Sequence, residues 1–363
     1  MNAARHFAQS YADARAKFLA AVERAGLELH AHVHPLIGRD GETLAMDVAR
    51  FGPADARAVL IVSSACHGVE GYCGSGIQGA LLADSGLHAA AAAGGVALLY
   101  IHALNPYGFS WLRRATHENV DLNRNFQDFT RPLPHNPEYD RIAHLLVPAE
   151  WPPNPQVKAG IAGYLAQHGP KALQAAVSGG QYEHPRGLFF GGHGPTWSHQ
   201  TLRHVLQDHG RRCRRLAWLD LHTGLGPSGH GERIWAGPDE AAGIARARAW
   251  WGRQVTSIYD GSSESPPLTG LMWLVAGQEC AQAEYTGIAL EFGTLPFEQV
   301  MAALRAEQWL DNHPEAGASR RTQIKRQFRD AFYVDTDTWK ARVVEQGVEA
   351  VQQAIAGLAG PGG

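Results

Sequence analysis

The sequence lacks the features that mark several functional classes. Lys and Arg total 32 against 35 Asp and Glu, a formal net charge of −3, which argues against a nucleic-acid or membrane-surface partner. No run of 18 apolar residues occurs, and residues 1–27 lack the apolar core of a signal peptide. We therefore expect a cytoplasmic protein.

Cysteine and charged residues are also scarce. The four cysteines, at positions 66, 73, 213 and 280, form no CxxC pair, so no structural zinc knuckle is indicated. In a reducing compartment they are expected to be buried thiols. Because hydrophobic residues make up 45% of the chain and charged residues 18%, we expect a large packed core.

Two common catalytic signatures, GxSxG at a strand-to-helix elbow and HExxH, are missing. Residues 224–229 do match GxGxxG, the fingerprint of dinucleotide-binding proteins. That fingerprint requires a helix after the glycines, whereas Pro227 and the residues after it favour a loop and a strand. A nicotinamide-dependent role is therefore a minor alternative, which a search for a melting-temperature shift with NAD or NADP would test.

What the sequence does contain is an alternation of short apolar runs and amphipathic segments. The proline-rich stretch 127–215 is expected to be loops and helices inserted between strands. We expect a single domain over 1–363, built as a three-layer α/β/α sandwich around one mixed, mostly parallel twisted sheet. The predicted strands are 42–51, 57–65, 96–104, 216–221, 233–236 and 286–292, and the predicted helices are 5–25, 76–84, 239–252, 297–311, 319–332 and 337–357.

Potential metal ligands follow two of the predicted buried strands. His67 and Glu70 lie directly after strand 57–65, and His222 lies at the end of strand 216–221. The carboxyl ends of parallel strands meet at one edge of a sheet, where ligands gather in open α/β folds. Two histidines and one glutamate, with one position left open for water, form a catalytic zinc site. The alternative is a hydrogen-bonded loop, because a His-x-x-Glu pair often occurs by chance.

A second constellation, residues 105–126, carries three arginines after a predicted strand. The guanidinium groups of Arg113, Arg114 and Arg124 suit carboxylate recognition and oxyanion stabilisation. The alternative is a solvated basic turn, but apolar residues alternate with the arginines. A third feature is Glu291, a carboxylate at the end of strand 286–292, which can serve as a general base or simply pair with an arginine.

The ordered blocks HGVEG, NPYG, LRRATHENVDLNRNF, DLHT and LEFGT, between residues 57 and 294, resemble the motifs of the zinc metallocarboxypeptidase superfamily. This superfamily includes carboxypeptidase A-like enzymes and the succinylglutamate desuccinylase and aspartoacylase branch. The resemblance implies one Zn²⁺ per chain, bound by His67, Glu70 and His222.

The same resemblance assigns roles to the remaining residues. Arg114 would polarise the scissile carbonyl, and Asn123 with Arg124 would bind a substrate carboxylate. Glu291 would be the general base. Because the arginine is doubled, Arg113 is an alternative to Arg114 and is included with the substrate-binding residues.

The expected activity is hydrolysis of an amide bond next to a free carboxylate, with a peptide or an N-acyl amino acid as partner. A metallocarboxypeptidase is preferred, an N-acyl amino acid deacylase is the alternative, and a non-catalytic binding protein on the same fold is the alternative of another class. Digestive members of the superfamily also use a tyrosine on a mobile loop. Tyr259 and Tyr285 are candidates, but neither lies in a recognisable motif.

Overall fold

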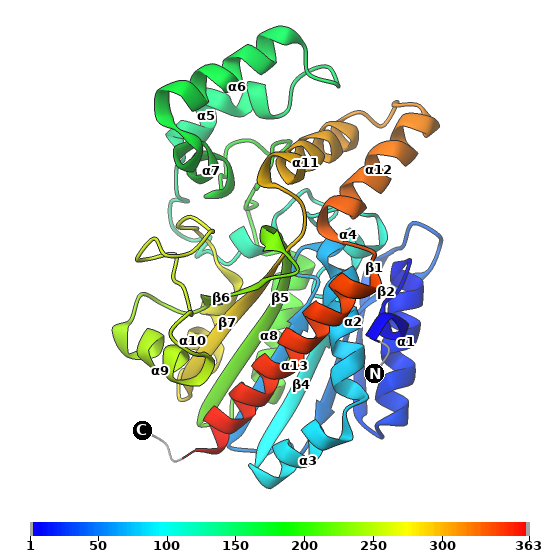
Figure 1. Ribbon diagram of the computed structural model, residues 1–363, viewed down its shortest axis with the longest axis vertical. Coiled ribbons are helices and arrows are strands. Elements are labelled where there is room, and N and C mark those ends of the chain that lie inside the picture. Colours follow the sequence, from blue (N-terminus) through cyan, green and yellow to red (C-terminus); the bar gives the residue numbers. More distant parts are fainter. Residues whose placement is uncertain (1–2, 361–363) are drawn as a thin grey trace.

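The computed structural model describes residues 3–360 and contains one seven-stranded sheet (Figure 1). The strands are β1 (Glu28–Ile37), β2 (Thr43–Phe51), β3 (Ala58–Ser64), β4 (Val96–His102), β5 (Arg215–Ser228), β6 (Gly231–Trp235) and β7 (Glu284–Gly293). Their order is β1-β2-β4-β3-β5-β7-β6. The central strands β4, β3, β5 and β7 are parallel, and β1, β2 and β6 run antiparallel to their neighbours. The predicted α/β fold with a mixed sheet is confirmed.

Helices cover both faces of this sheet, which gives the predicted three layers (Figure 1). One face packs against α1 (Tyr11–Arg24), α2 (Gly71–Leu82), α3 (Ser85–Ala93), α9 (Ala241–Trp251) and α13 (Asp337–Ala359). The other face packs against α8 (Trp197–His209) and α10 (Val275–Glu279). Within residues 3–360, every helix is too short or too polar to cross a membrane.

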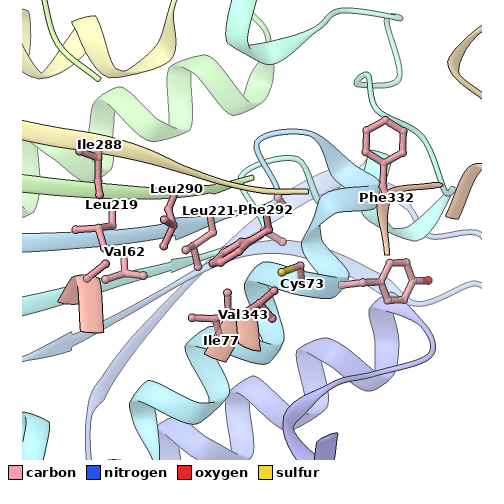
Figure 2. Close-up of a cluster of buried hydrophobic side chains, with 14 of the residues drawn as sticks. Val62, Cys73, Ile77, Leu219, Leu221, Ile288, Leu290, Phe292, Phe332 and Val343 are labelled. Carbon is pink, nitrogen blue, oxygen red and sulfur yellow. The ribbon is translucent and has the colours of Figure 1, made fainter. Parts of the chain in front are cut away.

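The core on the α2 and α13 side shows how side-chain alternation positions the polar residues of β5 (Figure 2). Leu219 and Leu221 point into this core, where they meet apolar side chains of β3, β7, α2 and α13. Because successive side chains on a strand point to opposite faces, Asp220 and His222 point to the other side. The apolar residues of β5 therefore determine which face of the sheet the side chain of His222 points to.

The segment between β4 and β5 is largely helical. It contains α4 (Pro106–Ser110), the 3₁₀ turn η3 (Leu122–Arg124), α5 (Pro137–Leu146), α6 (Pro155–His168) and α7 (Pro170–Ser178), and it ends with α8. Helices α5, α6 and α7 lie beyond one end of the sheet, at the top of Figure 1. They share that end with α11 (Phe297–Asn312) and α12 (Ala318–Phe332).

Three expectations need correction. The strand β1 was not predicted, helix α2 begins at Gly71 rather than at residue 76, and the first helix begins at Tyr11 because Ser10 caps its amino end. The GxGxxG segment also differs from a dinucleotide site. Its first residues extend β5 to Ser228, and the next element is strand β6 rather than a helix, so the dinucleotide alternative is rejected.

Candidate metal centre and catalytic site

The predicted ligands and base lie at the carboxyl ends of neighbouring parallel strands. Strand β3 ends at Ser64, Ala65 adopts a left-handed φ of 57°, and His67 precedes the 3₁₀ turn η2 (Gly68–Glu70). His222 and Glu291 are direct partners in the register of β5 and β7. The three strands thus bring together groups that are separated by more than 200 positions in the sequence.

The loop that carries His67 packs closely against the segment that carries the arginines. A Cβ on Gly68 would lie 2.0 Å from the carbonyl carbon of Gly108, so no larger residue fits there. The backbone N–H of Gly68 donates to the carbonyl of Arg114 at 3.1 Å, and that of Val69 donates to the carbonyl of Arg113 at 2.9 Å. This contact brings the Arg114 side chain next to the ligands.

His67, Glu70 and His222 form a compact, buried cluster, with their ligand atoms all within 4.8 Å of one another. The two Nδ1 atoms are 3.3 Å apart. Nδ1 of His67 lies 2.9 Å from Oε1 of Glu70, and Nδ1 of His222 lies 3.1 Å from Oε2. The backbone N–H of Thr223 also donates to Oε2 at 3.1 Å, which orients the carboxylate.

The donor set fits a divalent cation. Nε2 of His222 lies 2.5 Å from Oδ2 of Asp220, a carboxylate oxygen that can only accept, so Nε2 carries the proton. In the neutral ring, Nδ1 is then a lone pair facing Glu70 and His67. Burial lowers the pKa of His222, but Asp220 and Glu70 raise it well above its usual value. The cluster therefore attracts positive charge, and two imidazoles with one carboxylate suit zinc.

A carboxylate lies next to the Nε2 atom of each imidazole, on the side of the ring away from the Nδ1 cluster. Oδ1 of Asp121 lies 3.2 Å from Nε2 of His67, and Asp220 contacts Nε2 of His222. Asp220 itself accepts a hydrogen bond from Ser63 Oγ at 2.6 Å, and Ser63 accepts one from Trp218 Nε1 at 2.7 Å. Carboxylate partners of this kind fix the orientation of ligating histidines. Asp121 was not among the predicted site residues, although it lies within the DLNRNF block.

Replacing Asp220 by asparagine is expected to weaken zinc binding about 10- to 100-fold, because His222 loses its charged orienting partner. The dissociation constant would be measured by competition with a chromophoric chelator. Asp239→Asn, at an exposed position, is the control and should bind zinc like the wild type. Equal affinities in all three proteins would contradict the orienting role.

The adjacent residues Arg113 and Arg114 lie in two different environments. Arg114 lines the site, with Nη1 3.2 Å from Oε1 of Glu70 and Nε 2.8 Å from Oδ2 of Asp121. Arg113 points away, with Nε 3.2 Å from Glu307 and Nη1 2.8 Å from Asp311. Arg113 does not line the cavity, so the prediction that it contacts substrate is not supported and Arg114 is the candidate.

The Arg114 guanidinium is held in place on several sides. Asp121 and Glu70 accept its hydrogen bonds, and the guanidinium carbon lies 4.9 Å from the centre of the Phe189 ring. Burial raises the pKa of Asp121, but the charges of Arg114, His67 and Arg124 hold it well below its usual range. Asp121 is therefore an anion that positions the arginine as well as the histidine.

Asn123 and Arg124, the predicted carboxylate-binding residues, also line the cavity. Oδ1 of Asn123 accepts from the backbone N–H of Met272 at 2.8 Å. Arg124 donates to the carbonyl oxygens of Ser178 and Asn123, and its guanidinium lies 5.6 Å from the Phe189 ring centre. Three of its five N–H groups are used in these bonds, and Nη1 also lies 4.0 Å from Oδ1 of Asp121. Phe189, which no sequence motif singled out, contacts both arginines.

Glu291 lines the same cavity from β7. Its Oε1 accepts a hydrogen bond from the backbone N–H of Leu225 at 3.1 Å. Burial and the nearby negative charge of Glu70 raise the pKa of Glu291 to about 8. A carboxyl group with a pKa near neutrality can both accept and return a proton, which is the property required of a general base.

A cavity of about 90 Å³ joins these groups. Gln174 and Ser178 of α7 line it from the insertion, and Phe297, Val300, Met301 and Leu304 line it from α11. The wall beyond Glu291 is apolar and consists of Ile234, Ile258, Leu268, Trp273 and Ala289. Neither Tyr259 nor Tyr285 lines the cavity, and their hydroxyls donate to backbone carbonyls of Gly237 and Ala236.

Comparison with known proteins places the chain in a family. Residues 7–346 match the family described as protein of unknown function (DUF2817), and the chain belongs to that family. Among curated proteins the sequence has no match.

Solved structures with a similar fold include carboxypeptidase A from Helicoverpa armigera, with 11% identity, a TM-score of 0.43 and coverage of 89% of this chain and 74% of that chain. A metallo-carboxypeptidase from Burkholderia cenocepacia has 13% identity, a TM-score of 0.37 and coverage of 89% and 68%. Bovine thrombin-activatable fibrinolysis inhibitor, in complex with tick carboxypeptidase inhibitor, has 11% identity, a TM-score of 0.43 and coverage of 93% and 98%.

Proposed function

We propose that this chain is a zinc-dependent hydrolase that cleaves an amide bond next to a free carboxylate, acting on peptides as a metallocarboxypeptidase. One observation carries the proposal. The ligand atoms of His67, Glu70 and His222 converge within 4.8 Å of one another, in a cavity that Glu291 and Arg114 also line. A ligand set, a base and a fixed cation in one cavity are the parts that metal-assisted hydrolysis needs.

The residues divide the work of hydrolysis. Zinc bound by the cluster would supply Lewis acidity and lower the pKa of a water molecule towards neutrality. Glu291 takes a proton from the attacking water and delivers it to the leaving nitrogen. Arg114, held rigid by Asp121 and Phe189, stabilises the negative charge that develops on the carbonyl oxygen.

The cavity lining supports recognition of a terminal carboxylate beside an apolar side chain. Arg124 lines the cavity and can bind a carboxylate, because guanidinium forks match its geometry. The wall that includes Ile234, Leu268 and Trp273 carries no charged side chain, and a charged substrate group there would lose its hydration without a partner. We therefore infer a preference for substrates with an apolar residue next to the free carboxylate.

The size of the cavity keeps the deacylase alternative open. A volume of about 90 Å³ is below the roughly 300–1,000 Å³ of most small-molecule sites. Helices α7 and α11 both contribute to its lining, which favours a small substrate such as an N-acyl amino acid over a long peptide. The non-catalytic alternative requires that neither class of compound is hydrolysed.

The first test is the metal content of the purified protein, measured by mass spectrometry. About one zinc per chain is expected from the three-ligand set. His67→Ala and His222→Ala should each lose it, because two ligands do not hold zinc at the affinity of three. His144→Ala, outside the cluster, is the matched control and should retain zinc. A wild-type protein that takes up no zinc even after reconstitution would refute the hydrolase proposal.

The second test separates the substrate classes. The zinc-loaded protein would be assayed with dipeptides, longer peptides and N-acyl amino acids that share the same C-terminal residue. Turnover of peptides of all lengths supports the carboxypeptidase, and turnover of N-acyl amino acids alone supports the deacylase. Zinc binding without turnover of either class would leave the binding-protein alternative.

A further inference from the structure

A second cavity, of about 350 Å³, lies between α1, α2 and the 3₁₀ turn η1 (Ala3–His6). Its volume is within the roughly 300–1,000 Å³ of small-molecule sites. Among residues 3–360, four basic side chains line it, namely Arg5, His6, Lys17 and Arg24, and no acidic side chain does. None of its lining residues belongs to the metal-site cavity, so a ligand bound here is independent of the proposed hydrolase activity.

The positive charges of this cavity are poorly compensated. Within the described residues, Arg5 and Arg24 form no ion pair, and the one side-chain bond of Arg5 goes from Nε to Nε2 of His6 at 3.1 Å. Lys17 does have an anionic neighbour, Asp13, at 3.1 Å. Burial, followed by the charges of Arg5, Arg24 and Lys17, lowers the pKa of His6. Converging like charges are unfavourable unless an anion joins them.

The inner wall of the cavity adds polar groups. Ser75 of α2 is buried and lines the cavity, and its hydroxyl lies 3.0 Å from Nε2 of His102. His102 is fully buried, and its Nδ1 has no hydrogen-bond partner among the described residues. His6 lies against the same helix, because a Cβ on Gly79 would meet its Nδ1 at 3.4 Å. The cavity therefore combines exposed cations with a buried hydroxyl.

We propose that this cavity is a binding site for a small oxyanion with two or more negative charges. Guanidinium groups bind phosphate and carboxylate oxygens through paired N–H donors. Two arginines, one lysine and a histidine would share the charges of such a ligand. The shared chemistry is that of a phosphorylated small molecule or a polycarboxylate, and the cavity is larger than a single phosphate ion requires.

The site can be tested on the full chain by calorimetry and by thermal unfolding at constant ionic strength, with pyrophosphate, citrate and orthophosphate as probes. Zinc would first be removed with the neutral chelator 1,10-phenanthroline, because pyrophosphate and citrate also bind metal ions. Binding of pyrophosphate alone indicates a phosphorylated ligand. Equal binding of pyrophosphate and citrate indicates recognition of charge in either type of oxyanion.

The double variant Arg5→Gln, Arg24→Gln is expected to bind the best probe at least tenfold more weakly. The control is Arg131→Gln, Arg253→Gln, at two exposed positions outside the cavity, and should bind like the wild type. Without the anion, the first variant should unfold at the same or a higher temperature, because it relieves repulsion. No binding, equal loss in both variants, or a lower unfolding temperature of Arg5→Gln, Arg24→Gln without the anion would overturn the proposal.

Discussion

Replacing Glu291 by glutamine is expected to lower kcat by about 10²- to 10⁴-fold, the usual contribution of a general base, while the zinc content stays at the wild-type level. Glutamine keeps the shape of the side chain and can still accept the hydrogen bond from the backbone N–H of Leu225. It cannot accept the proton of an attacking water. Initial rates would be measured with the best substrate found in the screen, together with metal content.

Glu232 provides a matched control for this substitution. It is the direct cross-strand partner of Glu291 on β6, so both side chains lie on the same face of the sheet. It is buried but does not line the cavity, and its Oε1 accepts from Thr256 Oγ and from the backbone N–H of Glu264. Glu232→Gln should keep kcat within a few-fold of the wild type. Equal losses in the two variants would mean that Glu291 acts only through the structure of the sheet.

Replacement of the two adjacent arginines is expected to have different effects, on activity for Arg114 and on stability for Arg113. Arg114→Lys should lower kcat about 10²- to 10³-fold, as the loss of an oxyanion donor does, because lysine cannot reproduce the guanidinium fork. Arg113→Met should destabilise the fold by about 3–5 kcal/mol, because it leaves Glu307 buried without its arginine partner. Lys325 still contacts Glu307 at 2.7 Å, which places the expected loss towards the lower value.

Urea unfolding and steady-state kinetics on the same preparations would distinguish the two effects. The Arg113→Met protein should retain the wild-type kcat per folded molecule, and the Arg114→Lys protein should lose activity at temperatures where it is fully folded. The reverse pattern, with activity lost on replacing Arg113, would show that the arginine facing the substrate has been assigned incorrectly.

Much of the sheet was predictable because its central strands are buried on both faces. The runs 58–62 and 216–219 consist of apolar residues without a polar residue between them, a pattern typical of parallel strands between helices. The same reasoning located His67, His222 and Glu291, since each lies at the carboxyl end of such a strand. The expectation that His67 and His222 meet followed from the parallel direction of the strands, and the place of Glu291 beside them followed from the resemblance to the superfamily.

The strand β1 escaped prediction because it is an exposed edge. Only His34 of its ten residues is buried, and Val33 and Ile37 are 60% and 66% exposed. Pro35 and three histidines also depart from the β-branched and aromatic residues that favour strands. Its pairing with β2 depends on the neighbouring strand rather than on a local pattern. A strand whose conformation depends on tertiary contacts leaves no local sequence pattern from which it can be predicted.

The directions of side chains outside regular strands could not be predicted from the sequence either. Arg113 and Arg114 lie in a loop, where alternation does not apply, so either could face the ligands. Their separation depends on Glu307 of α11 and on Asp121, partners that lie 194 and 7 positions away. Phe189 reaches the site from the insertion, whose conformation follows no simple periodicity. Contacts of this kind become visible only when the fold is known.

The site is built partly from strand ends and partly from the helices α7 and α11. This division affects which substitutions the protein can accumulate during evolution. The groups assigned to bond cleavage sit on strand ends and on the short loop packed against them, whereas α7 and α11 supply much of the covering wall. Substitutions at Gln174 or Met301 would alter the shape of the chamber without moving His67, His222 or Glu291. Relatives with different α7 and α11 sequences are therefore expected to keep the proposed chemistry and to differ in the substrates that fit, so the ligand residues alone do not predict the substrate.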